Sequence, residues 1–410
     1  MANEEKRVLT ARDIGQLLGK KVAKLVTRKL TAPGDNYGSV MLSVDATLDS
    51  GSKMALVAKM FPLDEMAQRI FQNPKSMKKE IGVYQVISPE YHKIQEEQSV
   101  PPSRRLHAFC SCPGARLTLG NYDEEQLADE NSVLLLENLK EQGYRTGDRI
   151  SGLDLKHTEF VLERLARFHA TAVAIKQKKP LVFRNKLLKI LTPFKLVEGT
   201  KEDDVKNNEK FIEKLRTIPA CYRNVEALSE LFMDQIEFTH SDKFLPIREP
   251  YATFMHFDFW TNNMMFKYKS EVDEEPVDFK IVDFQVSQYG SPVPDLMLFL
   301  FTSTQKGIVP EHIDRFLELY HNNFLEWLKT LGCETKMFSY TSFLKEVKIA
   351  APVTLPQIVY MLMPITFNKE QIEKFGEGFA KEGGQPLEFN GVYITKISEA
   401  LDTYVEKGWL

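Results

Sequence analysis

The sequence has few of the features that mark secreted, membrane-embedded or nucleic-acid-binding proteins. It contains four cysteines in 410 residues, and Cys110 and Cys112 are too close together for an ordinary disulfide framework. Basic and acidic residues nearly balance, 53 against 57, and the net charge is only −4. This balance gives no reason to expect a nucleic-acid partner or an anionic membrane surface as a partner.

The sequence also shows no apolar segment typical of a secretory signal or a membrane span. Residues Met1 to Arg7 have no apolar core of a secretory signal, and the apolar run from Leu296 to Phe301 is far too short to span a bilayer. We therefore expect a cytoplasmic protein without membrane insertion, whose thiols are reduced and mostly structural. A zinc site at His107, Cys110 and Cys112 is conceivable, but no fourth ligand stands at finger-like spacing.

Length and hydrophobic pattern together predict two lobes. A chain of 410 residues exceeds the size of one small domain. We predict a bilobal α+β fold with a small β-rich lobe at 1–137 and a larger, mainly helical lobe at 138–410. Alternating β-branched runs predict strands at 22–30, 39–48, 54–61, 115–119 and 132–136. Helical spacing predicts helices at 11–21, 64–73, 76–87, 153–176, 309–331, 337–349, 353–364 and 390–407, whereas the charged 201–209 region is interpreted as a solvated loop or helix entry.

The most informative passage runs from His256 to Phe284. It contains Asp258, Asn263 five residues later, and Asp283 at the end of a strand-like run. Phosphoryl transfer needs a carboxylate that accepts or orients the proton of the acceptor, together with oxygen ligands for magnesium. We predict that Asp258 is the general base and that Asn263 and Asp283 bind Mg²⁺. The Asp-x-x-x-x-Asn spacing is common by itself and becomes specific only with the downstream Val-Asp-Phe.

A nucleotide site should accompany this passage. Lys59 lies inside the apolar run Ala55 to Phe61, where a charge is costly unless it is paired. Glu80, 21 residues later on an expected helix, is the best partner. We predict that Lys59 binds ATP phosphates and that Glu80 orients it; the alternative is that Lys59 extends to solvent from an edge strand.

A glycine-containing turn precedes Lys59. Gly34, Tyr37 and Gly38 lie between two expected strands, and backbone amides in such a turn can approach phosphate oxygens. This is not a full Gly-x-Gly-x-x-Gly pattern, and two glycines in a turn are usually only a hairpin connection.

Three further residues flank the catalytic passage. We expect His256 to brace the loop by hydrogen bonds, and Trp260 to be core packing that lies near enough to touch an acceptor. Asp295 begins an apolar helix. It is expected either to cap that helix or to hold the backbone of the catalytic loop.

At these residues the chain resembles the CHK-kinase-like, or ecdysteroid-kinase-like, family within the aminoglycoside and choline kinase group. The resemblance runs from about Gly34 to the helices after Asp295 and is most specific at 256–267 and 281–290. It implies a protein-kinase-like fold and transfer of phosphate from ATP, with magnesium, to a hydroxyl of a small molecule. The resemblance also includes the hinge-like segment 133–139, and it implies that Glu137 and Leu139 contact the nucleotide.

The resemblance leaves the acceptor open. Ecdysteroid-like steroids and hydroxylated xenobiotics are the implied class, and a choline- or ethanolamine-type kinase is the alternative. Aromatic and Met residues that could line an acceptor pocket, or equally a helix core, are Phe299, Phe301, Trp327, Tyr360, Met361 and Met363. One departure concerns Phe257, where the family usually has glycine. It motivates a second alternative, a nucleotide-binding module without catalysis.

Overall fold

The computed structural model describes residues 8–30, 39–62, 68, 72–119, 125–193, 195, 199–270, 274–368, 370–371 and 388–410. The chain forms two compact units, one of residues 1–85 and 110–144, the other of residues 86–109 and 145–410. The expected boundary after residue 137 stays a prediction. The observed units differ from it in that residues 86–109 belong to the larger unit and the smaller unit extends to Tyr144.

The smaller unit is built on an antiparallel sheet with the strand order β1-β2-β3-β5-β4. Every second residue of β2 is buried from Val44 to Leu48, as expected for a sheet with one face against a core. The core also includes Ile14, Leu56 and Leu135. The elements are α1 (Ala11–Leu18), β1 (Val22–Lys29), β2 (Val40–Leu48), β3 (Lys53–Met60), α3 (Asn73–Gly82), β4 (Gly114–Arg116), β5 (Val133–Glu137) and the 3₁₀ turn η3 (Leu139–Gln142).

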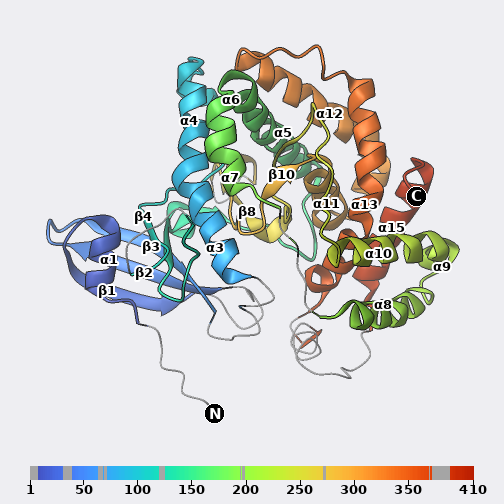
Figure 1. Ribbon diagram of the computed structural model, residues 1–410, viewed down its shortest axis with the longest axis horizontal. Coiled ribbons are helices and arrows are strands. Elements are labelled where there is room, and N and C mark those ends of the chain that lie inside the picture. The colour runs from blue at the N-terminus through green and yellow to red at the C-terminus, as the bar shows by residue number, and fades with distance from the viewer. Residues whose placement is uncertain are drawn as a thin grey trace. The chain divides into compact units, whose positions relative to one another are not determined.

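The larger unit is mainly helical and surrounds a buried helix. All residues of α11 are buried, and α5 packs along α12 (Figure 1). Its helices are α4 (Ser88–Glu97), α5 (Leu155–Lys178), α6 (Pro180–Val182), α7 (Leu188–Ile190), α8 (Lys201–Leu215), α9 (Pro219–Arg223), α10 (Val225–Thr239), α11 (Val293–Ser303), α12 (Ile308–Thr330), α13 (Tyr340–Thr366) and α15 (Gly391–Glu406). Short turns are η2 (Pro102–Arg104), η4 (Phe183–Leu187) and η5 (Thr261–Asn263), while η1 (Val83–Ile87) and β6 (Tyr144–Arg145) cross the limits of the units.

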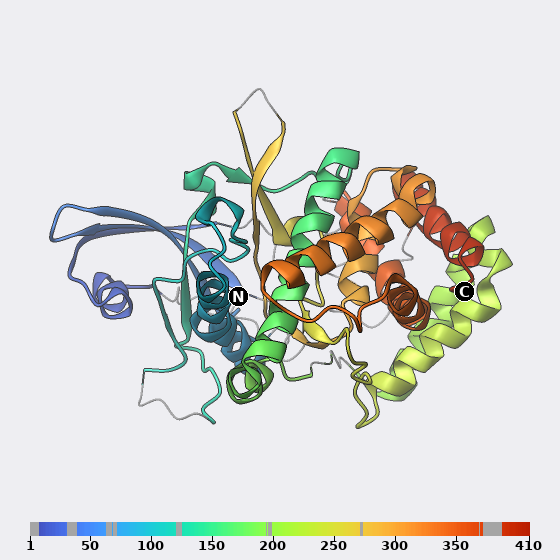
Figure 2. The same ribbon diagram turned by 90° about the horizontal axis from the view of Figure 1, so that it is seen from above.

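Short strands inside the larger unit position the catalytic passage. β7 (Thr253–Met255) pairs with β10 (Gln288–Gly290), and β8 (Met264–Tyr268) pairs with β9 (Pro276–Ile281), all antiparallel. The β8–β9 hairpin is visible as two twisted strands in Figure 2. Both ends of the passage are therefore held by strand pairing, with residues 256–263 between β7 and β8.

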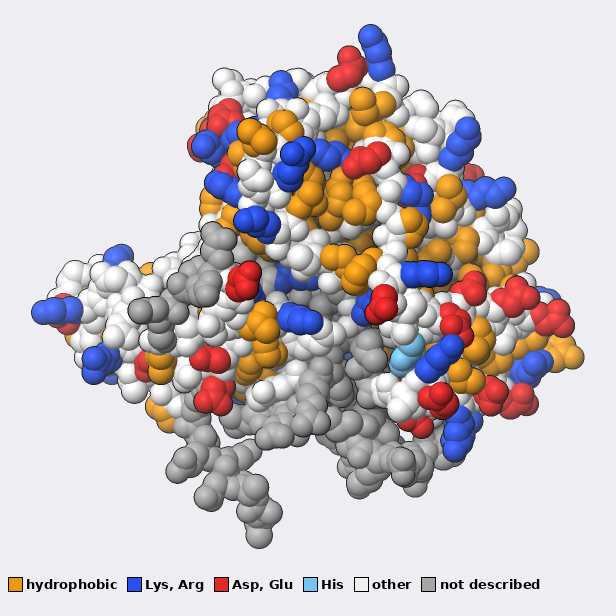
Figure 3. Space-filling model, in the orientation of Figure 1, with side chains coloured by type: hydrophobic (Ala, Val, Ile, Leu, Met, Phe, Trp, Pro, Cys, Tyr) orange, Lys and Arg blue, Asp and Glu red, His pale blue; other side chains and the backbone are white. Residues whose placement is uncertain are grey.

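The expected α+β class is confirmed, with an antiparallel sheet in the N-terminal part and helices in the C-terminal part. Of the two interpretations of the 201–209 region, the helix entry is confirmed. The region is the start of α8, and Figure 3 shows acidic and basic side chains together over α8 and α10, in keeping with a solvated face. One local prediction was wrong, because the helices expected at 337–349 and 353–364 form one helix, α13, with Pro352, Pro356 and Pro364 inside it.

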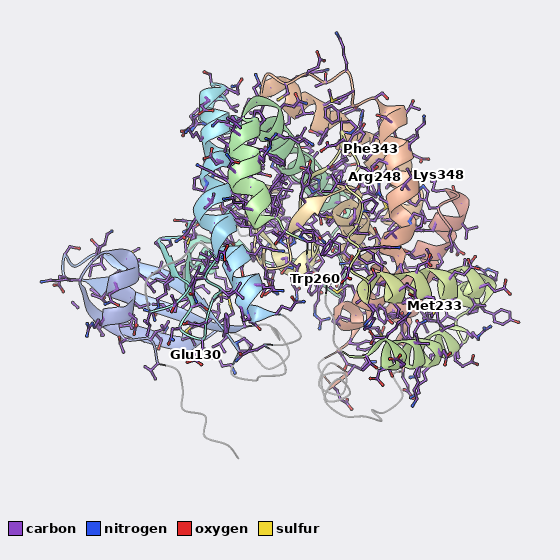
Figure 4. The ribbon with its side chains drawn as sticks, in the orientation of Figure 1. Glu130, Met233, Arg248, Trp260, Phe343 and Lys348 are labelled. Atoms are coloured by element: carbon purple, nitrogen blue, oxygen red, sulfur yellow. The ribbon has the colours of Figure 1, made fainter. Side chains whose placement is uncertain are left out.

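Tertiary packing explains the continuity of α13. Proline inside a helix costs about 3 kcal/mol because it removes a hydrogen bond and crowds the preceding turn. The buried side chains that flank the prolines, among them Leu355, Ile358 and Leu362, offset this cost. Arg248, labelled in Figure 4, also anchors the helix through Glu346, with Nε–oxygen distances of 3.0 and 3.1 Å.

Because it is continuous, α13 is long and apolar enough to cross a membrane by length and composition. Neither of the two shorter helices expected at 337–349 and 353–364 has that length. In the structure 61% of its most apolar window is buried. Such burial is typical of the core helix of a globular unit.

Candidate active site

Lys59 and Glu80 form a buried ion pair in the smaller unit. Lys59 lies on β3 between partners on β2 and β5, and its Nζ is 2.6 Å from Glu80 Oε2 of α3. The two residues are only 3% and 1% exposed. A charged pair this deeply buried is costly to desolvate, so it is weak evidence for a purely stabilising role. The alternative in which Lys59 extends to solvent is wrong.

The other residues assigned to nucleotide binding give less information. The Glu137 carboxylate accepts hydrogen bonds from the Ser111 backbone N–H at 2.8 Å and from Gln142 Nε2 at 2.7 Å. Leu139 is buried at the start of η3. Their nucleotide-binding roles stay predictions, and Gly34, Tyr37 and Gly38 lie outside the described residues.

Asp258 and Asn263 are in direct contact in the larger unit. Asn263 Nδ2 donates to Asp258 Oδ2 and to the Asp258 backbone carbonyl, both at 2.8 Å. The 3₁₀ turn η5 brings Asn263 back toward Asp258, which explains the five-residue spacing. Because the amide nitrogen is used in this way, the Oδ1 oxygen of Asn263 is the atom suited to a cation.

The environment of Asp258 favours its protonated form. Burial, and after it the nearby negative charge of Asp283, raise the pKa of Asp258 to about 7, although the side chains of Trp260 and Asn263 oppose this shift. A carboxyl group with a pKa near neutrality is suited to proton transfer at physiological pH. A cation near Asp258 and Asp283 would reverse part of this shift.

Asp283 follows β9 in a backbone conformation that is rare for a non-glycine residue. Its φ is 68°. The next residue, Phe284, is fully buried and lies 5.0 Å from the His256 ring and 5.2 Å from the Phe109 ring, between centroids. Packing of Phe284 thus holds the left-handed turn at Asp283, a kind of strain that clusters at functional sites.

His256 braces the loop, as expected. It is fully buried, its Nδ1 lies 3.3 Å from the Asp258 backbone nitrogen, and its Nε2 lies 3.0 Å from the Val282 carbonyl oxygen. These contacts require Nδ1 to accept and Nε2–H to donate, so the ring is neutral. Burial lowers the pKa of His256, which is consistent with that state. One ring therefore links Asp258 to the segment that carries Asp283.

Asp295 holds the backbone of the catalytic loop. Its carboxylate accepts hydrogen bonds from the His256 N–H at 2.6 Å and the Phe257 N–H at 2.7 Å. The N-cap of α11 is Pro292, so the capping role is wrong and the alternative is confirmed. The sequence did not point to the residues behind Asp295. His169 Nε2 lies 3.1 Å from its carboxylate, and His169 Nδ1 lies 2.7 Å from the Tyr320 hydroxyl.

Phe257 occupies a position that favours glycine. Its φ is 68°, in the left-handed region, where a side chain costs about 1–2 kcal/mol. Asp295 fixes its N–H, and Gln357 Nε2 donates to its carbonyl at 2.9 Å. The loop thus retains the backbone shape that glycine would adopt easily, although phenylalanine stands there.

The residues fit a magnesium site that the nucleotide would help to complete. Magnesium prefers oxygen ligands and is usually held by one or two carboxylates together with phosphates and water. Asn263 and Asp283 supply an amide oxygen and a carboxylate. Among the described residues, no group of three or more His, Cys, Asp and Glu could hold a metal ion alone. Cys110 and Cys112 are free thiols, and burial raises their pKa values to about 12 and about 11.

Most of the aromatic and Met residues considered for an acceptor pocket belong to the core. Phe299, Phe301, Trp327 and Met363 are at most 4% exposed. Tyr360 is 38% exposed and stacks on Phe211 with centroids 4.9 Å apart. Trp260, marked in Figure 4, differs from them because its buried Nε1 makes no hydrogen bond of normal geometry among the described residues, although the indole lies close enough to the Asp258 carboxylate to lower its pKa.

Comparison with known proteins agrees with the resemblance seen in the sequence. Residues 33–333 match the family described as "Ecdysteroid kinase-like family". No curated protein matches the chain. Similar solved structures include an amicoumacin kinase in complex with AMP-PNP, Ca²⁺ and Ami, with 11% identity, TM-score 0.40 and coverage of 93% of this chain and 88% of that chain. Another is a macrolide 2′-phosphotransferase from Brachybacterium faecium, with 11% identity, TM-score 0.33 and coverage of 85% and 91%.

Proposed function

The chain belongs to the ecdysteroid kinase-like family, and we propose that it transfers the γ-phosphate of ATP to a hydroxyl group of a small molecule. The observation that carries the proposal is the contact between Asn263 and Asp258, in which the amide of one residue orients the carboxylate of the other. Family membership supports the reaction class, and this contact supports the role of Asp258 as the oriented proton acceptor.

In the proposed reaction, Asp258 accepts a hydrogen bond from the acceptor hydroxyl and takes its proton as the oxygen attacks the γ-phosphorus. The bond from that phosphorus to the β–γ bridging oxygen breaks, and ADP leaves. Asn263 and Asp283 would hold Mg²⁺, and this ion would neutralise charge on the phosphates. Lys59, oriented by Glu80, binds phosphate oxygens of the nucleotide in the same proposal.

The acceptor we propose is an ecdysteroid-like steroid or a related hydroxylated metabolite or xenobiotic. Family membership supports this class. A specific contact is suggested by Trp260, whose indole N–H makes no hydrogen bond of normal geometry among the described residues and lies near the carboxylate of Asp258, two positions earlier. We propose that it donates to an oxygen of the acceptor. The protein is proposed to act in the cytoplasm.

The deciding experiment is a mass-spectrometric screen of the purified protein with magnesium-ATP. Ecdysteroids, choline, ethanolamine and hydroxylated xenobiotics are the acceptors, and the readout is the mass gain of one phosphate. The proposal expects a product with a steroid or xenobiotic, and far less of it with Asp258→Asn. If a product forms only with choline or ethanolamine, the acceptor is an amino alcohol and the proposed steroid or xenobiotic class is wrong. ATP binding without any product across the library would favour a non-catalytic module.

A further inference from the structure

A basic cavity lies in the larger unit. Its volume is about 230 Å³, and its walls come from three segments that are distant in the sequence: residues 102–107, the middle of α5, and β9. None of the lining residues belongs to the proposed catalytic or magnesium site. The ionisable lining residues are Arg104, Arg105, Arg164, Arg167, His107 and Asp278.

The side chains that line this cavity are mainly basic. They include four guanidinium groups and one carboxylate, Asp278, which is also 3.8 Å from Lys280 Nζ. Burial lowers the pKa of Arg164, and the charge of Arg167 lowers it further. Burial likewise lowers the pKa of Arg167, although Glu163 and Glu326 oppose that effect. Arginine remains protonated in proteins, so these charges repel one another in a partly desolvated space.

Arg167 differs from the other three arginines. Arg104 pairs with Glu326 at 3.4 Å, Arg105 with Glu96 at 2.9 Å, and Arg164 with Glu163 at 3.4 Å. In the part of the chain that the structure describes, no hydrogen bond or ion pair reaches the guanidinium of Arg167. Its Cζ lies 5.1 Å from the centroid of the Trp327 ring, so stacking fixes its plane and leaves its N–H donors available.

The walls are held in place before any ligand arrives. Gln95 Oε1 accepts the Leu106 N–H at 2.6 Å, and Arg105 Nε donates to the Val100 carbonyl at 3.0 Å. Lys280 Nζ on β9 donates to the His107 carbonyl at 2.7 Å, which joins two walls. Arg164 is further oriented by the Phe160 ring, with its Cζ 4.4 Å from the centroid. Such preorganisation reduces the entropy that a ligand would lose on binding.

We propose that this cavity binds a small phosphate-bearing anion, either inorganic phosphate or the phosphate group of a phosphomonoester. Planar guanidinium groups bind phosphate oxygens in bidentate geometry, and several of them converge here around the unpartnered Arg167. The volume of about 230 Å³ is below the roughly 300–1,000 Å³ of pockets for drug-sized ligands, which favours a small metabolite. The proposal involves the larger unit alone and is independent of phosphotransfer.

Equilibrium dialysis without magnesium or nucleotide tests this proposal on the full chain. The probes are radiolabelled inorganic phosphate, glycerol phosphate and acetate, at constant ionic strength in sodium chloride. We expect saturable binding of the two phosphates and much weaker binding of acetate. Arg167→Gln should raise the Kd for phosphate at least tenfold, and Arg167→Lys should raise it less because charge is kept. Preference for glycerol phosphate over phosphate would identify a phosphomonoester as the ligand.

A control variant distinguishes binding at this cavity from non-specific electrostatic binding of anions to the protein surface. Arg223→Gln removes an exposed arginine of α9 that pairs with Asp402, and it should leave the Kd unchanged. An equal Kd in Arg167→Gln and the unsubstituted protein, equal losses in Arg223→Gln and Arg167→Gln, or no saturable binding would each overturn the proposal. If Arg167→Gln does not fold, as judged by circular dichroism, Arg164→Gln decides by the same criteria.

Discussion

The carboxylate of Asp295 accepts the backbone N–H of Phe257 at 2.7 Å and that of the preceding His256 at 2.6 Å. Phe257 needs such a partner because its φ of 68° is unfavourable for a residue with a side chain. The catalytic loop is therefore held in shape by Asp295 of α11, and His169 contacts the carboxylate of Asp295 in turn. A fully buried carboxylate maintains a strained turn one residue before the proposed base.

Asp295→Ala should destabilise the protein strongly. It leaves two buried or partly buried N–H groups without an acceptor, at about 1–3 kcal/mol each, so we expect a loss of roughly 2–6 kcal/mol. Asp295→Asn should cost less, because its amide oxygen can still accept one of the bonds. Urea denaturation measures the effect, with the exposed Asp242→Asn as control. Stability of Asp295→Ala within error of the control would contradict the assigned role.

Phe257 offers a direct test of backbone strain. Phe257→Ala and Phe257→Gly both remove the ring, but only glycine relieves the positive φ. We expect the glycine variant to be more stable than the alanine variant by about 1 kcal/mol, although glycine is usually the less stabilising residue. Thermal denaturation of the pair measures this difference. An alanine variant as stable as the glycine variant would show that the loop relaxes to another conformation.

Asp258→Asn should separate activity from stability. We expect turnover to fall by about 10²–10⁴-fold, since the proton acceptor is lost, while ATP binding changes little. The variant should keep the Asn263 contact through its amide oxygen. Turnover assays and nucleotide titration of the same preparation are the measurements. Turnover equal to that of the unsubstituted protein would remove Asp258 from the mechanism.

The same substitution should change how stability depends on pH. The folded state raises the pKa of Asp258 to about 7 from an ordinary value near 4, so the folded protein binds the extra proton between these values. Stability is then lost as pH rises from about 4 to 7, where the buried group must ionise. We expect Asp258→Asn to be more stable than the unsubstituted protein at pH 8, and the difference to disappear at pH 4. Denaturation at both pH values in the absence of magnesium measures it, and a pH-independent difference would contradict the shift.

Lys59 and Glu80 should behave as a coupled pair. Removing one partner leaves a buried charge, so Lys59→Met and Glu80→Gln should each cost about 3–5 kcal/mol. Combining Lys59→Met with Glu80→Leu should restore much of that stability, because two apolar side chains need no pairing. ATP affinity should remain low in the double variant. Recovery of ATP binding together with stability would show that Lys59 does not contact the nucleotide.

Much of this molecule could be predicted from local patterns. The strands β1, β2, β3 and β5 and the helices α5, α12 and α15 agree with the predicted ranges within about two residues, because periodicity of 2 or 3.6 is a property of neighbouring residues. Pairing of Lys59 with Glu80 was also predictable, since a lysine in a buried strand requires a counter-charge. The spacing placed Asp258 and Asn263 in one short loop, and the structure shows that they are in direct contact there.

Other features depend on segments that meet only after folding. Asp295 lies 39 residues beyond His256, and either a helix cap or a loop partner was compatible with its place in the sequence. The arginine-lined cavity joins residues 102–107 to α5 and β9, and no local pattern relates these segments. Continuity of α13 through three prolines likewise depends on the packing around it. Spacing along the chain thus determined which side chains are available for the chemistry, whereas packing between distant segments decided which of them hold the loop, because only packing sets their distances and their exposure to water.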